Sequence, residues 1–474
     1  MTTNPVDVHC HFFNVKFAFR ELLEIGWSKA KGNYPYQSDD MPLSRERSVS
    51  EPDLDSLLKY VARLLATALQ SAEDNYKLEQ KCYKKGQWNY SAPLITVPLM
   101  MDIFFVLDDG SSLKKRTMPA GLPEDEEKRV FGTTLIPPES LDSFTRLAMK
   151  LKADVIQTFE KERKQRGLTG APKRERLDLV WKELDDVISE FQHPEMEEKQ
   201  DVCRTIEGGV QMTRGFRKHL LELQELKNKN HKTVLPFLAV DPRRTGIEKL
   251  VKELILPGIF KGIKLYPPLG YLPTHPDLYP IYQLCIENDI PVTTHTSPNG
   301  MKNMCKQLQT KSKKQDGTID IITTSADNPV ELFATPNNWR AILENKKYSN
   351  LRLNFAHFGG SEAIQEYANF LIKGKKSALI SANWSYQIIQ LMIEFENVYA
   401  DFSYCPEKQT IENINILIEH HPILKTRLMF GTDFVMVMKE ASMGSLENYF
   451  RNCAGMGSAI HADNAMKFLM QNAS

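Results

Sequence analysis

Short apolar runs rich in β-branched residues recur along the chain, and each ends in a polar or ionisable residue. We interpret eight of these runs as strands. They lie at 6–11, 94–102, 233–241, 262–264, 290–295, 351–357, 398–401 and 427–433. The segments between them place apolar residues at helical spacing, as at Leu278, Ile281 and Cys285. Alternating strands and helices predict parallel strands with crossover helices, and eight strands predict an α/β fold, the (β/α)8 TIM barrel.

The chain is much longer than such a barrel requires. A (β/α)8 barrel typically needs about 250 residues, whereas this sequence has 474. The surplus lies at about 14–90 and 108–230, and its apolar periodicity predicts helices at 54–69, 141–155, 177–188 and 216–226. We therefore predict one distorted barrel domain over 1–474, with long helical insertions after the first and second strands.

Composition narrows the class of partner. The 60 Lys and Arg residues balance the 60 Asp and Glu residues, whereas nucleic-acid binders and membrane-surface proteins usually carry a basic excess. A small-molecule partner is therefore favoured over nucleic acid or membrane. The seven cysteines form no Cys-x-x-Cys pair, which is typical of reduced intracellular thiols. With no secretory signal and no apolar run long enough to span a bilayer, we expect a cytoplasmic protein.

Candidate metal ligands stand at the ends of the predicted strands. His9 and His11 share one face of the first strand, about 6.5–7 Å apart along it, close enough to share a metal ion. His295, His357 and Asp433 end the fifth, sixth and eighth strands. Because the C-terminal ends of barrel strands meet at one mouth, these side chains should converge. Imidazoles with a carboxylate suit Zn²⁺, with Mn²⁺ or Fe²⁺ as alternatives.

Lys264, at the end of the fourth strand, allows three interpretations. It is carbamylated and bridges two metal ions, or it is charged and pairs with an anionic substrate group, or it forms a structural salt bridge. Asp102 and Asp401, which end the second and seventh strands, are candidates for orienting metal-bound histidines, with ordinary loop hydrogen bonding as the alternative.

The order of these residues along the chain resembles that of the amidohydrolase superfamily. The narrower resemblance is to the amidohydrolase-2, or amidohydrolase-related, branch, which also contains metal-dependent decarboxylases. It covers about 1–13 and 231–474. The supporting stretches are VLPFLAVDPR at 234–243, NWRAILENKKYSNLRLNFAHFGG at 338–360, NVYAD at 397–401 and NAMKFL at 464–469.

This resemblance implies a centre of one or two divalent metal ions per chain, Zn²⁺ being the leading candidate. It implies that His9, His11, His295 and Asp433 hold the first ion. Lys264 and His357 would complete a binuclear site, or His357 would orient the water and polarise the carbonyl. In such enzymes the metal lowers the pKa of water to about 7, and Asp433 would pass the water proton to the leaving group.

The leading hypothesis for function is a metal-dependent hydrolase that cleaves a C–N or C–O bond of a small carbonyl compound, such as an amide, cyclic imide, ester or lactone. The alternative is a non-oxidative decarboxylase of a small aromatic or unsaturated acid, with Lys264 gripping the carboxylate. A third hypothesis is a non-enzymatic binding protein that uses an inherited barrel. The insertions are expected to shape the substrate pocket or a contact between the subunits of a homodimer.

Overall fold

The computed structural model describes residues 4–12, 71–110 and 209–470, apart from short internal gaps. These gaps are residues 87, 89, 109, 211, 213, 304, 306, 326–328, 374–377, 435 and 440–442. The helices predicted at 54–69, 141–155 and 177–188 lie outside the described residues.

Eight parallel strands occur where the apolar runs predict them, each overlapping one run. They are β1 (Val6–Cys10), β2 (Ile95–Pro98), β3 (Phe237–Val240), β4 (Gly262–Leu265), β5 (Val292–His295), β8 (Leu353–Ala356), β9 (Val398–Asp401) and β10 (Leu428–Met429). The core strands are buried along their whole length, which explains why their sequences are continuous apolar runs.

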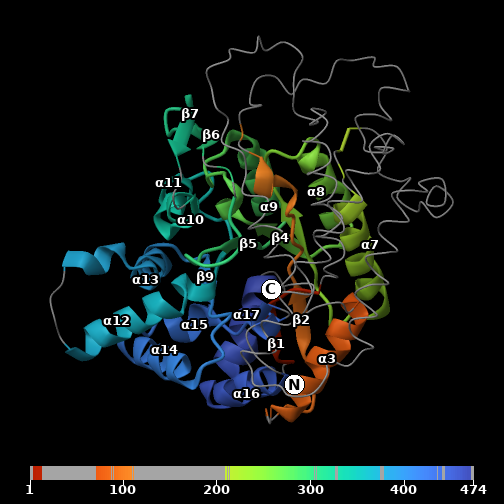
Figure 1. The fold of residues 1–474 in the computed structure, drawn as a ribbon, viewed down its shortest axis with the longest axis vertical. Coiled ribbons are helices and arrows are strands. Elements are labelled where there is room, and N and C mark those ends of the chain that lie inside the picture. Colours follow the sequence, from red (N-terminus) through yellow and green to blue (C-terminus); the bar gives the residue numbers. More distant parts are fainter. Residues whose placement is uncertain are drawn as a thin grey trace, which may run out of the picture.

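These strands close into a ring. Six of them pair in the order β10-β9-β8-β5-β4-β3, and β1 pairs with β2. The bridge between Thr96 and Val234 joins β2 to the segment that leads into β3, while a bridge between Cys10 and Phe434 joins β1 to the segment after β10. All of these pairings are parallel. The prediction of a TIM barrel is therefore confirmed (Figure 1).

Helices surround the barrel strands (Figure 1). A buried face of Ile247, Leu250 and Leu254 on α8 shows the apolar periodicity that packs such helices onto the strands. The described helices are α3 (Ala72–Lys85), α7 (Arg214–Lys229), α8 (Ile247–Ile255), α9 (Tyr279–Glu287), α10 (Pro329–Ala334), α11 (Arg340–Leu343), α12 (Ser361–Lys373), α13 (Trp384–Glu394), α14 (Lys408–His420), α15 (Leu424–Arg427), α16 (Met443–Cys453) and α17 (Asn464–Leu469).

Two helices belong to the predicted insertions. Helix α7 contains the apolar face predicted at 216–226, and Phe216, Leu220 and Leu223 are buried. Helix α3, at the end of the first insertion, begins at an N-cap in which the Ser71 side chain accepts a hydrogen bond from the Asp74 N–H. Within the predicted insertions, the structure thus describes helices at Ala72–Lys85 and Arg214–Lys229.

An antiparallel hairpin after β5 was not predicted. It consists of β6 (Gln307–Lys313) and β7 (Ile319–Ser325), and it lies at the upper left in Figure 1. Its residues are mostly polar. Leu308 and Thr310 of β6 are buried, whereas Ile319 and Ile321 of β7 are exposed. The hairpin therefore lacks the continuous buried apolar run that marks the barrel strands in the sequence.

The N-terminal end of the barrel is filled with apolar side chains. Val6, Ile95 and Phe237, at the starts of their strands, form one cluster with residues of the C-terminal helix α17. The Phe468 ring of α17 lies 5.5 Å from the Tyr399 ring and 6.3 Å from that of Phe237. The polar side chains described below therefore gather at the opposite end.

Among the described residues, no helix has the length and apolar character needed to cross a membrane.

We predict that Phe468→Ala lowers the free energy of unfolding by about 3–5 kcal/mol, because it leaves a cavity in this cluster. Chemical denaturation measures the effect. The matched control, Lys467→Ala, changes an exposed residue of the same helix and should alter the free energy by less than about 0.5 kcal/mol. Equal effects of the two substitutions would contradict the role given to the α17 cluster.

Candidate metal centre

Four histidines and one aspartate converge at the C-terminal ends of the strands. His9 lies in β1 and His11 directly after it, His295 ends β5, His357 follows β8, and Asp433 lies in the turn after β10. All five are buried, with at most 6% of the residue surface exposed. The mouth predicted from the strand ends is therefore formed.

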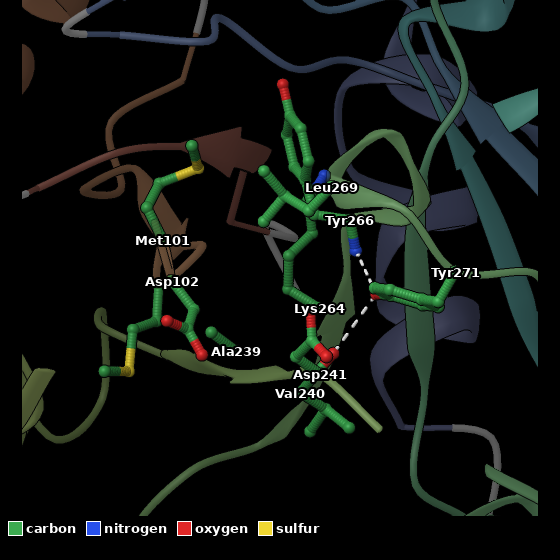
Figure 2. A pocket seen from close by; sticks show the side chains of 10 residues that line it. Met101, Asp102, Ala239, Val240, Asp241, Lys264, Tyr266, Leu269 and Tyr271 are labelled. Atoms are coloured by element: carbon green, nitrogen blue, oxygen red, sulfur yellow. Dashed lines mark hydrogen bonds between the residues drawn. The ribbon is translucent and has the colours of Figure 1, made fainter. Parts of the chain in front are cut away.

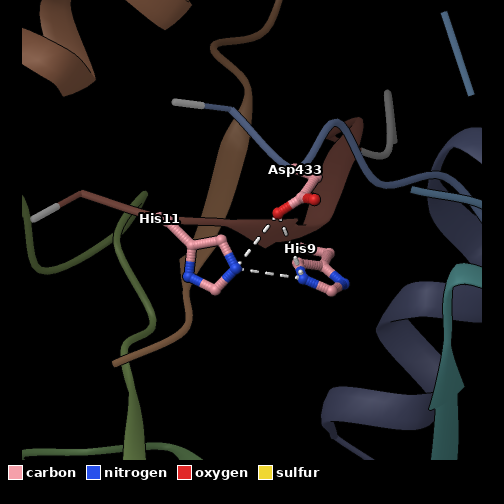
Figure 3. A group of neighbouring side chains, drawn as sticks. All are labelled: His9, His11 and Asp433. Carbon is pink, nitrogen blue, oxygen red and sulfur yellow. Dashed lines mark hydrogen bonds and ion pairs between the residues drawn. The ribbon is translucent and has the colours of Figure 1, made fainter. Parts of the chain in front are cut away.

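His9, His11 and Asp433 make the tightest group (Figure 3). The two Nε2 atoms of the histidines lie 3.3 Å apart. Asp433 Oδ1 lies 3.1 Å from the Nε2 of His11 and 3.6 Å from that of His9. Three potential ligand atoms, two nitrogens and one oxygen, thus face one point.

The turn that carries Asp433 is bound to β1 through its backbone. The N–H groups of Thr432 and Asp433 both donate to the His9 carbonyl, at 3.1 and 2.7 Å. Asp433 has φ 56° and His357 has φ 66°, in the left-handed region that non-glycine residues seldom adopt. Such strained positions cluster at functional sites, where the surrounding structure holds them.

A chain of hydrogen bonds fixes the tautomers of three histidines. His295 Nε2 lies 2.9 Å from the Asn299 carbonyl, which can only accept, so Nε2 carries the proton of the neutral ring. His295 Nδ1 then accepts from His357 Nε2 at 3.1 Å. His357 Nδ1 in turn accepts from the Ser403 hydroxyl at 2.9 Å, and Ser403 Oγ accepts from His9 Nδ1 at 2.9 Å. The Nε2 of His9 is left with a lone pair.

These histidines are neutral because they are buried. Burial lowers the pKa of His9 and of His357 well below the usual 6.5, and it lowers the pKa of His295 to about 3. The Lys264 ammonium adds to the lowering in all three rings. Neutral rings are the form that binds metal ions.

His11 presents its Nε2 lone pair in the same way. Its Nδ1 lies 2.8 Å from the Leu99 carbonyl and donates to it, so in the neutral ring Nε2 has no hydrogen. Two lone pairs therefore face each other at 3.3 Å beside Asp433 Oδ1. That oxygen is buried and accepts no hydrogen bond of good geometry from a described residue. A cation between the three atoms removes this repulsion, so the residues fit a divalent metal ion.

Asp401 lies behind the histidines. Its carboxylate accepts hydrogen bonds from the Asn354 side-chain amide at 2.7 Å and from the backbone N–H of His357 at 3.2 Å. It also lies 3.2 Å from His9 Nδ1. A carboxylate in this position orients a metal-bound imidazole. Asp102 does not share this arrangement, because it forms a bidentate ion pair with Arg244.

Lys264 lines a small pocket together with Tyr266 and Leu269 (Figure 2). The residue is only 2% exposed, and its ammonium makes no hydrogen bond or ion pair with any described residue. Burial lowers its pKa to about 8, although the Asp401 and Asp433 carboxylates act in the opposite direction. The pocket carboxylate of Asp241 is held by Arg243 at 2.7 Å. The interpretation of Lys264 as part of a structural salt bridge therefore finds no partner among the described residues.

Comparison with known proteins identifies the family. The sequence model of the Amidohydrolase family (Amidohydro_2) matches residues 196–473, more than half of the chain. The chain belongs to this amidohydrolase family. It is accordingly a metal-dependent enzyme of the amidohydrolase superfamily, as the order of its strand-end residues predicted. A comparison with curated proteins gives no significant match.

Solved structures similar to this amidohydrolase include decarboxylases and a hydrolase. A 2,6-dihydroxybenzoate decarboxylase from Rhizobium is 15% identical with a TM-score of 0.33, over 54% of this chain and 79% of that one. A dihydroxybenzoic acid decarboxylase from Polaromonas sp. JS666, with bound manganese and 2-nitroresorcinol, is 15% identical with a TM-score of 0.34, over 55% and 77%. A dihydroorotase from Saccharomyces cerevisiae is 13% identical with a TM-score of 0.26, over 54% and 73%.

The structure of the amidohydrolase places the six predicted site residues in two sets. His9, His11 and Asp433 form one group of potential ligands. His295 and His357 are instead paired with each other at 3.1 Å, and Lys264 faces the pocket. The roles predicted for these last three residues as metal ligands stay predictions.

Two residues of the amidohydrolase site were missed by sequence reasoning. Ser403 connects His9 with His357, yet a serine two residues after a strand gives no distinctive signal. His219 of α7 is buried near His11, and burial lowers its pKa to about 3. A signal for it existed: it lies three residues after Phe216, a spacing that places both residues on one helix face.

The titration of Lys264 can be tested in the metal-free amidohydrolase. Its folded-state pKa of about 8 is lower than the ordinary 10.5, so the unfolded chain binds more protons between these pH values and stability rises with pH there. At about 1.36 kcal/mol per pKa unit, the buried ammonium costs on the order of 3 kcal/mol below pH 8. We predict that Lys264→Met is more stable than the parent at pH 7, and that this difference shrinks from pH 8 to about 10.5.

Denaturation of both proteins with a chelator present, at pH 7 and pH 10, measures this difference. Lys249→Met, on a partly exposed side chain of α8, is the control and should show no such pH dependence. A Lys264→Met difference that is the same at both pH values would contradict a lowered pKa.

Proposed function

We propose that this protein is a metal-dependent hydrolase that cleaves a C–N or C–O bond of a small carbonyl compound, such as an amide, cyclic imide, ester or lactone. The observation that carries the proposal is the convergence of His9 Nε2, His11 Nε2 and Asp433 Oδ1. The proton of each imidazole is directed away from this point. Zn²⁺ suits such a set, with Mn²⁺ and Fe²⁺ as alternatives.

A divalent ion held by these three residues would activate a water molecule and polarise the scissile carbonyl. Residues of the chain around the ion would transfer the protons. Asp433 is the proposed general base and acid, because its Oδ1 lies 3.6 Å from the Nε2 of His9 and 3.1 Å from that of His11. Burial raises its pKa, which makes it a better base than an exposed aspartate.

His357 and His295 form a hydrogen-bonded pair at the mouth of the barrel. Their rings lie 4.7 Å apart and are joined by one hydrogen bond. We propose that His357 orients the water and the substrate carbonyl, or binds a second metal ion together with a carbamylated Lys264. The Tyr266 ring stacks on His295 with centroids 4.4 Å apart, and it lines the adjoining pocket.

The second candidate function is a non-oxidative decarboxylase of a small aromatic or unsaturated acid. One observation favours it: the Lys264 ammonium forms no hydrogen bond or ion pair with a described residue and faces a pocket that Met101, Tyr266 and Leu269 also line. A buried cation without a direct partner attracts an anion, and apolar walls accept a ring. In this reaction Lys264 would hold the substrate carboxylate.

A cytoplasmic location and a homodimer stay predictions.

The number of metal ions per chain separates these possibilities. We predict one or two divalent ions, measured by elemental mass spectrometry on protein purified without chelators and with bicarbonate present. Two ions would support a carbamylated Lys264 and a binuclear hydrolase. One ion would leave Lys264 as a substrate-binding cation and favour the decarboxylase. No ion, even after reconstitution, would contradict the proposed centre.

We predict that His9→Ala and Asp433→Asn each lower turnover by about 10²–10⁴-fold, since each removes a metal ligand or the proton-transfer group, while the fold is retained. Turnover is measured with a panel of cyclic imides, lactones and aromatic acids. The control is His231→Ala, an exposed histidine before β3. Undiminished turnover in either variant would contradict the mechanism.

The same assay identifies the reaction. For a hydrolase, ¹⁸O from labelled solvent enters the product acid. For a decarboxylase, bicarbonate is released and the organic product contains no solvent oxygen.

A further inference from the structure

Asp7 joins the two segments that carry the proposed metal ligands. It is fully buried in β1. Its Oδ1 accepts hydrogen bonds from the backbone N–H groups of His9 and Thr432, both at 3.0 Å, and its Oδ2 accepts from the Thr432 hydroxyl. Since Asp433 follows Thr432, one carboxylate fixes both the strand of His9 and the turn of Asp433.

A second carboxyl group lies against Asp7. Glu79 projects from helix α3 and is also fully buried. Its carboxyl oxygens, those of Asp7 and the Cys10 sulfur include ligand atoms that all lie within 4.8 Å of one another. No described lysine, arginine or histidine forms an ion pair with Glu79. The proposed catalytic chemistry makes no use of this residue.

Two buried carboxyl groups in contact cannot both be ionised without a cation, because each loses hydration and repels the other. Three donors stabilise the ionised form of Asp7. No donor does the same for Glu79, apart from the weak Cys10 thiol. Burial and the Asp7 charge therefore raise the pKa of Glu79 well above its usual range. A proton on Glu79 provides an O–H donor that faces Asp7.

We propose that Glu79 is a positioning residue for the metal centre: as a carboxylic acid it donates a hydrogen bond to Asp7 and so holds the backbone that carries His9 and Asp433. This role rests on the proposed metal centre. It gives the first insertion a function, because α3 lies within that insertion and supplies the group. Glu79 acts through Asp7 and the backbone and touches neither metal nor substrate.

The alternative occupant of this cluster is a cation bound by Asp7, Cys10 and Glu79. The proton is favoured because the Asp7 oxygens already accept three hydrogen bonds. Only three ligands are available there among the described residues, whereas structural zinc sites are almost always four-coordinate. The substitution Glu79→Gln distinguishes a proton from a cation, because glutamine keeps an N–H donor toward Asp7 but cannot supply a charged ligand.

The test compares Glu79→Leu, Glu79→Gln and the control Cys82→Ala, a buried residue one turn further along α3. The first measurement is amide hydrogen exchange of the metal-free proteins in the segments that contain His9 and Thr432. The second is the affinity and stoichiometry of Co²⁺ binding. We expect Glu79→Leu to speed exchange in both segments and to weaken binding by about 10–100-fold, the usual effect of losing an outer partner of metal ligands. Glu79→Gln and Cys82→Ala should match the parent in both.

Two outcomes overturn the proposal directly. If Glu79→Leu matches the parent in amide hydrogen exchange and in Co²⁺ affinity, Glu79 does not position the segments of His9 and Thr432. The cation would be shown instead if the parent had the near-ultraviolet absorption of a cobalt–thiolate bond, and if Glu79→Gln lost both this absorption and one Co²⁺ equivalent. If Glu79→Leu does not fold, Glu79→Gln decides alone: parental values support the acid, and altered values exclude it. A parent that binds no metal refutes the proposed function, whereas the exchange data still test the contact with Asp7.

Discussion

The candidate site depends on the closure of the barrel at β1. This strand pairs with β2 on one side and, through hydrogen bonds such as Val8 N–H to Phe430 O, with the last barrel segment on the other. Closure brings His9 and Asp433 together although more than 400 residues separate them. Without this contact, His9 and His11 would lie at one end of the open sheet and Asp433 at the other. The closed barrel is thus required to bring the candidate ligands together.

Closure alone places the rings but does not aim their nitrogens. That task falls to acceptors behind the site: the Leu99 carbonyl accepts a hydrogen bond from His11, and the Ser403 hydroxyl accepts one from His9. Because carbonyl oxygens only accept hydrogen bonds, the Leu99 carbonyl sets the tautomer of His11 directly. The Asn299 carbonyl sets that of His9 through the hydrogen-bonded chain of His295, His357 and Ser403.

The sequence was sufficient for the barrel because buried parallel strands must be apolar on both faces. It was insufficient for the β6–β7 hairpin, in which Leu308 and Thr310 are buried but most side chains of β7 face solvent, so that no continuous apolar run marks it. His9, His11 and Asp433 were predictable because strand ends converge in a barrel. The pairing of His295 with His357 was not, since ring orientation depends on contacts such as that with Asn299. Glu79 escaped notice because a helical glutamate is ordinarily exposed.

The junction between the first and last strands also has a consequence for biosynthesis. His9 and His11 are synthesised long before Asp433, which follows all eight barrel strands. A nascent chain therefore holds the two imidazoles before the carboxylate is made, and long-range strand pairing is also slow to form. With the proposed ligands, complete metal binding would thus have to wait until the last barrel strand is synthesised and paired with β1.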